Sequence, residues 1–320
     1  MHSSFYRILR KFQVCSANML WPPPMTTIKA SAMLRRLSTF APYVERTLPQ
    51  VTLAAKKDLS GLLVERSASY NSVEASVDGS IASIKLSRPK TQNAFNMPMW
   101  NEVYDAFWCA SADPDVRVVI LSGAGGNFSS GMDLAVFQEM KALAAAEACE
   151  GRKREQVFRS IEFFQRSISA PEMCSKPVLC AIEGNVIGAG VDLITACDLR
   201  FCTKDAKLSV KEVDLGIVAD VGTMQRLPNL VGDQRARELT YTGRAFSGVE
   251  AVSYGLCLES FASAEQMMDH VQSVAVTIAA KSPLTIRGIK RTSLYTRDHP
   301  TVDALNQVFT HHALTALTRT

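Results

Sequence analysis

Three carboxylates in the middle of the chain have the type and spacing to exchange protons with a bound substrate. Asp192 follows a glycine-rich segment, Glu212 lies 20 residues further on, and Asp220 lies 8 residues beyond Glu212 between two apolar residues. An acid in such surroundings is either a capping or paired structural residue, or a general acid or base with a raised pKa. Asp220, for example, could cap a helix that starts near Gly222. Both interpretations stay open for each residue taken alone.

Histidine and cysteine chemistry fits this region less well. The five histidines all lie outside it, so a Ser–His pair or a His-bound metal would have to recruit distant parts of the chain. The eight cysteines form no Cys-x-x-Cys pair, which argues against a zinc site or a redox dithiol and favours a reducing compartment. We therefore predict neither a metal nor a cofactor.

Two glycine-containing loops offer backbone N–H groups at the starts of predicted helices. The first is GAGVD at 188–192, where Leu193 replaces the last glycine of a dinucleotide-binding Gly-x-Gly-x-x-Gly motif, so no dinucleotide site is predicted. The second is SSGMDL at 129–134. Each could be merely a tight connection from strand to helix. Together they could stabilise a developing oxyanion with main-chain donors.

The elements that must position these groups alternate between strands and helices. Alternating apolar residues and an Asp78-Gly79 turn predict a hairpin over 72–87, and periodic or continuous apolar runs predict the other elements. The pattern indicates an α/β body followed by a helical C-terminal region. We expect helices over 97–112, most of 134–170, 191–197, 263–281, 283–295 and 301–317, and strands over 116–121, 178–182, 199–202 and 208–210, with a glycine-rich turn at 184–190.

The N-terminal segment differs in charge from the rest of the chain. Residues 1–44 contain six basic residues and no acidic one; without them the chain has 29 basic and 31 acidic residues, a net charge of −2. This composition predicts a mitochondrial presequence over 1–44, although a disordered basic tail or an extension before a true start at Met33 would look similar. The C-terminus is no peroxisomal Ser-Lys-Leu signal. No apolar stretch approaches the ~18 residues of a membrane span.

From about residue 70 to the C-terminus the sequence resembles the enoyl-CoA hydratase/isomerase (crotonase) superfamily, and most closely its dienoyl-CoA isomerases. Extended matches are more specific than any single motif. The residues that carry the likeness are Arg88-Pro89 with Asn93-Ala94, 130–134, Lys176-Pro177, Gly184, 190–192, 196–200, Lys211-Glu212-Val213-Asp214-Leu215-Gly216, Ala219-Asp220-Val221-Gly222-Thr223, 225–228, 281–283 and 295–299.

The resemblance implies a crotonase-like spiral of ββα units over 69–260, after a linker at 45–68, and a helical trimerisation region over 261–320. It implies an acyl-CoA thioester substrate and a homohexamer made of two trimers. The charge of the body predicts no nucleic-acid partner, and the N-terminal segment predicts a mitochondrial matrix location. The resemblance also implies an oxyanion hole from the N–H groups of Met132 and Ala189, where Ala189 replaces a frequent glycine. The implied substrate- and CoA-binding residues are Arg88, Ala94, Gly131, Met132, Asp133, Leu134, Ala135 and Gly190.

The implied reaction needs two acid–base groups. A 3,5-dienoyl thioester becomes the 2,4 isomer by losing a proton at carbon 2 and gaining one at carbon 6, through an enolate that two N–H donors would stabilise. The two carbons are roughly 5 Å apart, which is far for one carboxyl group to serve both. The resemblance assigns this pair to Glu212 and Asp220, in an order left open, and makes Asp192 an auxiliary charge.

Two other functions compete with this interpretation. An enoyl-CoA hydratase would hold a water between Asp192 and Glu212, but hydratases usually have Glu at the first position and Gly at that of Asp220. An RNA-binding or non-catalytic relative is the alternative from another class. The net charge of −2 on the body argues against RNA, and three retained carboxylates argue against an inactive scaffold.

Overall fold

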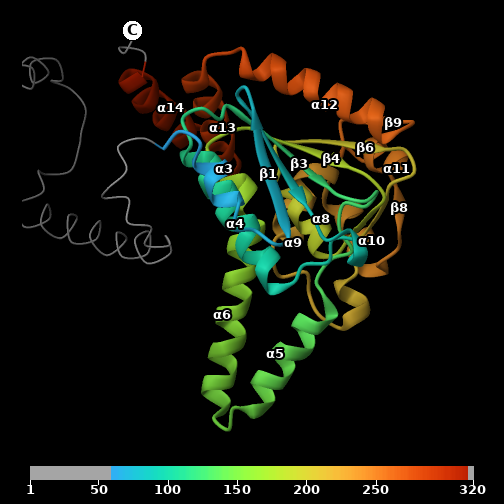
Figure 1. Ribbon diagram of the computed structural model, residues 1–320. Coiled ribbons are helices and arrows are strands. Elements are labelled where there is room, and N and C mark those ends of the chain that lie inside the picture. Colours follow the sequence, from blue (N-terminus) through green and yellow to red (C-terminus); the bar gives the residue numbers. More distant parts are fainter. Residues whose placement is uncertain (1–58, 316–320) are drawn as a thin grey trace, which may run out of the picture. The chain divides into compact units, whose positions relative to one another are not determined.

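The computed structural model describes residues 59–315, and a six-stranded sheet lies at its centre (Figure 1). Its first two strands form the predicted antiparallel hairpin, and each later strand pairs in parallel with its neighbour. Asp78 pairs with Ile81, so the turn residues are Gly79 and Ser80, one position later than predicted. The strand order is β1 (Val73–Asp78), β2 (Ile81–Leu86), β3 (Val118–Gly123), β4 (Val178–Ile182), β6 (Leu199–Thr203) and β9 (Glu259–Phe261).

A second, smaller sheet has three strands. It consists of β5 (Asn185–Ile187), β7 (Lys207–Ser209) and β8 (Phe246–Ser247). Successive turns of the chain give one strand to each sheet: β4 is followed by β5 and the helix α8 (Ala189–Thr195), and β6 by β7. The segment 184–190, predicted to be only a turn, therefore contains a strand, and the helix after it begins two residues earlier than expected.

Both faces of the central strands β3 and β4 are buried, as their continuous apolar sequences require. Side chains alternate along a strand, so Val119 and Leu121 join the main core while Val118 and Ile120 face the opposite side. That opposite side is covered by α12 (Ala264–Ala279). The main core packs beneath α4 (Met97–Ala112), whose predicted bounds are confirmed and whose first turn is capped by Asn96.

Two long helices, α5 (Leu134–Ala146) and α6 (Glu150–Ile168), form a hairpin that extends away from the sheets (Figure 1). This confirms the prediction that most of 134–170 is helical, and the short helix α7 (Ala170–Met173) follows. The remaining elements before the C-terminal region are η2 (Pro89–Thr91), η3 (Glu212–Leu215), α9 (Thr223–Val231), α10 (Asp233–Thr242) and α11 (Gly248–Ser253).

The C-terminal helices α13 (Pro283–Asp298) and α14 (Thr301–Thr315) follow α12, as predicted. Lys290 fixes α13 to the body: its buried ammonium donates to the carbonyls of Pro171 and Lys176 and pairs with Asp198 at 2.7 Å. Within residues 59–315, no helix is both long and apolar enough to cross a membrane.

The predicted linker at 45–68 is wrong in its second half. Residues 62–67 form the helix α3 (Leu62–Ser67), and Leu62 and Leu63 are buried in the main core. The folded unit therefore begins before residue 69, and the chain divides at Asp58. The presequence predicted over 1–44, the rest of the linker and residues 316–320 lie outside the described residues.

Candidate active site

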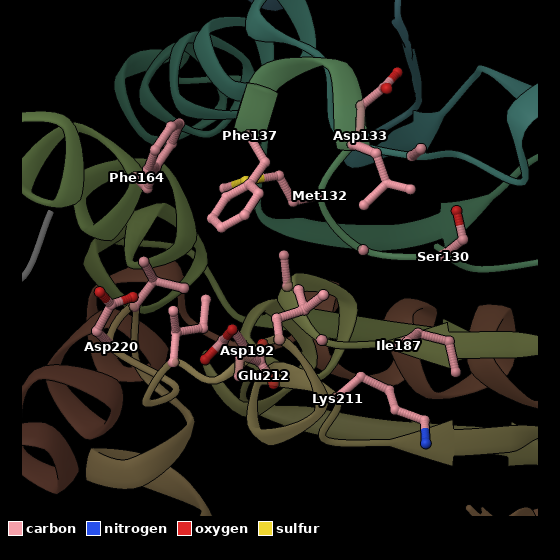
Figure 2. Close-up of a pocket in the computed structure, with 18 of the residues that line it drawn as sticks. Ser130, Met132, Asp133, Phe137, Phe164, Ile187, Asp192, Lys211, Glu212 and Asp220 are labelled. Atoms are coloured by element: carbon pink, nitrogen blue, oxygen red, sulfur yellow. The ribbon is translucent and has the colours of Figure 1, made fainter. Parts of the chain in front are cut away.

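A pocket of about 620 Å³ lies where α5 and α6 meet the two glycine-containing loops. One wall is apolar and comes from α4, α5 and α6. The opposite wall carries all three carboxylates singled out in the sequence, together with Lys211. Figure 2 shows Met132 and Phe137 facing Asp192 and Glu212 across this space. The structure therefore brings the three acids to one cavity, as the sequence pattern suggested.

Asp192 is the most firmly held of the three. It lies in the first turn of α8 and is fully buried, and its Oδ1 accepts a 2.6 Å hydrogen bond from the N–H of Thr223, the first residue of α9. Asp192 thus satisfies a free donor at the start of that helix. The capping role considered for Asp220 is wrong. The residue at the cap position of α9 is Gly222, and the N–H of Thr223 donates to Asp192 instead.

Glu212 begins η3 and lies beside Asp192 in the middle of the pocket (Figure 2). Burial, and next the negative charge of Glu212, raise the pKa of Asp192 to about 7. Burial also raises the pKa of Glu212, and the charge of Asp220 adds to that rise. One oxygen of each partner, Asp192 Oδ2 and Glu212 Oε2, is buried without a hydrogen bond within the described residues. Such a pair can hold or release a proton near neutral pH.

Asp220 lies at the other end of the pocket, near Phe164 of α6 (Figure 2). It belongs to the loop between η3 and α9 and is only half-buried. Its backbone carbonyl accepts a 2.6 Å hydrogen bond from Nε2 of Gln165. Burial raises the pKa of the Asp220 carboxyl. The pocket therefore has a coupled acid pair at its middle and a separate acid at one end.

The two glycine-containing loops lie against each other at the pocket. Ser129 and Val186 form a parallel bridge, with hydrogen bonds of 2.9 Å on either side. Gly131 has a φ of +91°, and a Cβ there would lie 2.7 Å from the carbonyl oxygen of Ile187, so only glycine permits this approach. Met132 and Ala189 both line the pocket, and neither backbone N–H is used in a hydrogen bond within the described residues. This geometry suits the predicted oxyanion hole.

The residues predicted for substrate and CoA binding divide into two groups. Ala94, Gly131, Met132, Asp133 and Leu134 line the pocket, whereas Arg88, Ala135 and Gly190 do not.

The three that do not line the pocket support the loops instead. The guanidinium of Arg88 donates to the carbonyl of Ala94 and pairs with Asp133 at 3.1 Å, which ties two loops together. The N–H of Ala135 donates to Asp133 at the start of α5. Gly190 packs against Ser129, where a Cβ would approach within 3.2 Å.

The apolar wall was missed in the sequence. It combines residues from three helices that are far apart along the chain, and each of these residues looked like ordinary helix core. Its members are Trp100, Phe137, Met140, Val157, Ile161 and Phe164. A wall of this kind can hold an extended hydrocarbon chain against the carboxylates. Among the described residues, no group of His, Cys, Asp and Glu has an arrangement that could hold a metal ion.

This chain is similar to known proteins over most of its length. The enoyl-CoA hydratase/isomerase family model matches residues 76–315. The chain is 42% identical over 245 residues to the peroxisomal Delta(3,5)-Delta(2,4)-dienoyl-CoA isomerase of Arabidopsis thaliana, covering 76% of this chain and 88% of that protein. It is 37% identical over 266 residues to the mitochondrial Delta(3,5)-Delta(2,4)-dienoyl-CoA isomerase of Homo sapiens, covering 80% and 79%.

Solved structures show the same fold. An enoyl-CoA hydratase from Bacillus anthracis superposes with a TM-score of 0.69 at 27% sequence identity, over 78% of this chain and 92% of that one. The predicted crotonase-like α/β fold is thereby confirmed. By its family match and by relatives that it covers over most of their length, the chain belongs to the enoyl-CoA hydratase/isomerase family.

Proposed function

We propose that this protein is an isomerase that converts 3,5-dienoyl-CoA to 2,4-dienoyl-CoA in the β-oxidation of unsaturated fatty acids. The observation that carries the proposal is the third carboxylate. Asp220 lies in the same pocket as the Asp192–Glu212 pair but at its end, beside the apolar wall. A reaction that moves two double bonds along a chain needs acid–base groups at two separated carbons, and this pocket offers them.

The arrangement of the loops suggests which acid acts at which carbon. The thioester oxygen would accept hydrogen bonds from the N–H groups of Met132 and Ala189, which would stabilise the enolate. Glu212 lies next to that position, because a Cβ on Gly188 would approach its Oε1 to 3.1 Å. This position supports a scheme in which Glu212 removes the proton at carbon 2 and Asp220 supplies the proton at carbon 6.

Asp192 would support this exchange without contacting carbon 6. Its Oδ1 is occupied by the N–H of Thr223, and burial and the charge of Glu212 raise the pKa of its carboxyl to about 7, so the two acids can hold one proton between them near neutral pH. A raised pKa keeps Glu212 ready to hold the proton that it has taken. CoA enters this scheme as part of the substrate, and acyl-CoA thioesters are the substrates that the family's name implies.

The hydratase interpretation is the second candidate, because the solved relatives include enoyl-CoA hydratases. Hydration needs two carboxylates that both face a bound water. One oxygen of Asp192, Oδ1, already accepts a hydrogen bond from the N–H at the start of α9. A hydratase also has no use for an acid at the position of Asp220.

Parallel assays on the purified protein separate the two candidates. The double bonds of a 3,5-dienoyl-CoA are conjugated only with each other, whereas those of the 2,4 isomer are also conjugated with the thioester, so absorbance rises at longer ultraviolet wavelengths. Hydration of a 2-enoyl-CoA instead removes absorbance. We expect a rapid rise with the dienoyl substrate and at least about 100-fold slower loss with the enoyl substrate. Faster hydration than isomerisation would overturn the proposed function.

We further propose a homohexamer of two trimers. The apolar face of α12 is covered by the sheet of its own chain, so α12 gives no reason to expect a partner. The exposed apolar residues of α13 and α14, Leu284, Ile289, Val302 and Leu305, are better support for subunit contacts. Light scattering should give a mass near six times 35.0 kDa, and a stable monomer at micromolar concentration would contradict it.

A mitochondrial location is also a proposal. Its support is the acid-free basic segment 1–44 and the mitochondrial relative in Homo sapiens, while the relative in Arabidopsis thaliana is peroxisomal. Residues 1–60 fused to a fluorescent reporter should direct it to mitochondria. A diffuse cytosolic signal or a peroxisomal signal would contradict the mitochondrial location.

A further inference from the structure

A second cavity, of about 390 Å³, lies behind Asp220. Asp220 and Val221 line both this cavity and the main pocket. The two spaces differ in chemistry, because the main pocket has a largely apolar wall, whereas most of the residues that line the second cavity are polar or charged. Its other lining residues are Gln165, Ser169, Glu172, Gly222, Gln225, Arg226, Arg297 and Asp298.

A charged network builds the floor of this polar cavity. Arg226 donates to Glu172 at 2.8 Å and to Ser169 at 2.8 Å, and Arg297 of α13 pairs with the other oxygen of Glu172. Although burial opposes it, hydrogen bonds from the two guanidinium groups lower the pKa of Glu172. Glu172 therefore stays ionised at neutral pH and is no proton donor itself. A cavity this large, with so many polar groups, meets the requirements for holding water.

Asp220 is held at the boundary between the two spaces. Gln165, whose Nε2 donates to the carbonyl of Asp220, is itself part of the polar cavity. The loop that carries the acid is therefore tied to the wet side, while the acid also lines the pocket for the acyl chain. An acyl chain lying along Phe164 would cover Asp220 from one side only.

The proposed reaction leaves the acids in the wrong protonation states. In one turnover the C2–H bond breaks and its proton goes to Glu212, while the O–H bond of Asp220 breaks and its proton forms the new C6–H bond. The enzyme then has a neutral Glu212 and an ionised Asp220. Before the next turnover Glu212 must give a proton to water and Asp220 must take one, so that the two transfers balance.

We propose that the polar cavity is a proton-exchange port through which solvent reprotonates Asp220 after each turnover. This inference rests on the proposed function and adds to it a water site outside the substrate pocket. The port lets Asp220 regain its proton while the acyl chain still fills the apolar pocket. Resetting the acid then does not have to wait for the product to leave.

Gln225 offers a way to close the port. It is exposed on α9 and lines the cavity, and no hydrogen bond of its side chain is found within the described residues. Gln225→Trp should fill the cavity without touching the main pocket. Asn229→Trp is the matched control, because Asn229 is exposed one helical turn further along α9 and does not line the cavity.

The expected result is a split between kcat and kcat/KM. With the port closed, Asp220 can regain its proton only after the product has left, which is the first irreversible step, so the block should lower kcat and KM together by about tenfold and leave kcat/KM unchanged. Product inhibition should change from competitive to noncompetitive. The product would also bind the enzyme form in which Asp220 is still ionised, whereas the substrate binds only after Asp220 has been reprotonated. The Asn229→Trp variant should behave like the native enzyme in both respects.

Two outcomes would overturn the inference. One is a Gln225→Trp enzyme with native kcat and competitive product inhibition. The other is a fall in kcat/KM with KM unchanged, which would mean that the substitution displaces Asp220 from the substrate. Failure of the proposed function is distinguishable from both, since the native enzyme would then not isomerise 3,5-dienoyl-CoA at all.

Discussion

Asp192 and Asp220 line the same pocket, yet their surroundings differ. Asp192 is fully buried in a helix, hydrogen-bonded to the start of α9 and coupled to Glu212. Asp220 is half-buried in a loop, held through its backbone by Gln165, and borders a second, polar cavity. The first environment suits a residue that fixes the geometry and charge of its neighbour. The second suits a residue that must exchange its proton with solvent in every turnover.

Glu212 should show the largest effect on activity, because it is the acid closest to the oxyanion loops. Glu212→Gln keeps the size of the side chain but removes its basicity, so we expect kcat to fall by about 10³-fold. The isomerase assay measures this. Asp214→Asn, in the same short helix, is the control: Asp214 is exposed and, among residues 59–315, forms an ion pair only with Lys211, so kcat should change little. A Glu212→Gln enzyme within tenfold of native would remove Glu212 from the chemistry.

Asp192 should affect stability in a pH-dependent way. Its folded-state pKa of about 7 lies above its unfolded value of ~3.9, so the stability gained by the neutral form is complete below pH ~4 and is lost as pH rises through 7. Asp192→Asn stays neutral and can still accept from the N–H of Thr223. We expect the stability advantage of this variant over native to be larger at pH 8 than at pH 5 by roughly 3 kcal/mol, because the native carboxyl ionises in the folded state as pH rises through 7.

Thermal melting at several pH values tests this expectation. Asp205→Asn, an exposed substitution in the turn between β6 and β7, should show no such trend. If the difference in melting temperature between Asp192→Asn and native stays constant from pH 5 to pH 8, the pKa of Asp192 is not raised in the folded state.

Gln165 should have the smallest effect. Its hydrogen bond to the carbonyl of Asp220 is worth about 1 kcal/mol, so Gln165→Ala should lower kcat about fivefold with KM nearly unchanged. Gln156→Ala, on an exposed position of the same helix, is the control. Equal kcat values for the two variants would show that the position of Asp220 does not depend on Gln165.

The sequence predicted the parts of this molecule whose signals are local. The hairpin of β1 and β2, the helix α4 and the strand β4 follow from apolar periodicity and turn residues, and their bounds agree closely with the structure. The strands β5, β8 and β9 were not predicted, because two or three residues carry no periodicity. The helix α3 lies in the predicted linker, because six residues give little periodic signal and the burial of the helix depends on distant partners.

The site was predictable in its acids and loops but not in its surroundings. Asp192, Glu212 and Asp220 stand out by type and spacing, and they do share one pocket. That Asp192 rather than Asp220 caps α9 depends on a contact between residues 31 positions apart. The hydrogen bond from Gln165 spans 55 positions. Contacts of this range arise from the fold and leave no mark in a single sequence.

The comparison between the two aspartates depends on whether Asp220 transfers a proton. Asp220→Asn keeps the shape of the side chain but cannot exchange protons at neutral pH, whereas Asp220→Ala removes it. The decisive measurement is the rate of 3,5-dienoyl-CoA isomerisation by both variants, with thermal melting recorded alongside. We predict that kcat falls by about 100-fold or more in both, with melting temperatures close to native. An Asp220→Asn enzyme that is fully active and normally folded would contradict the account and return the hydratase function to contention.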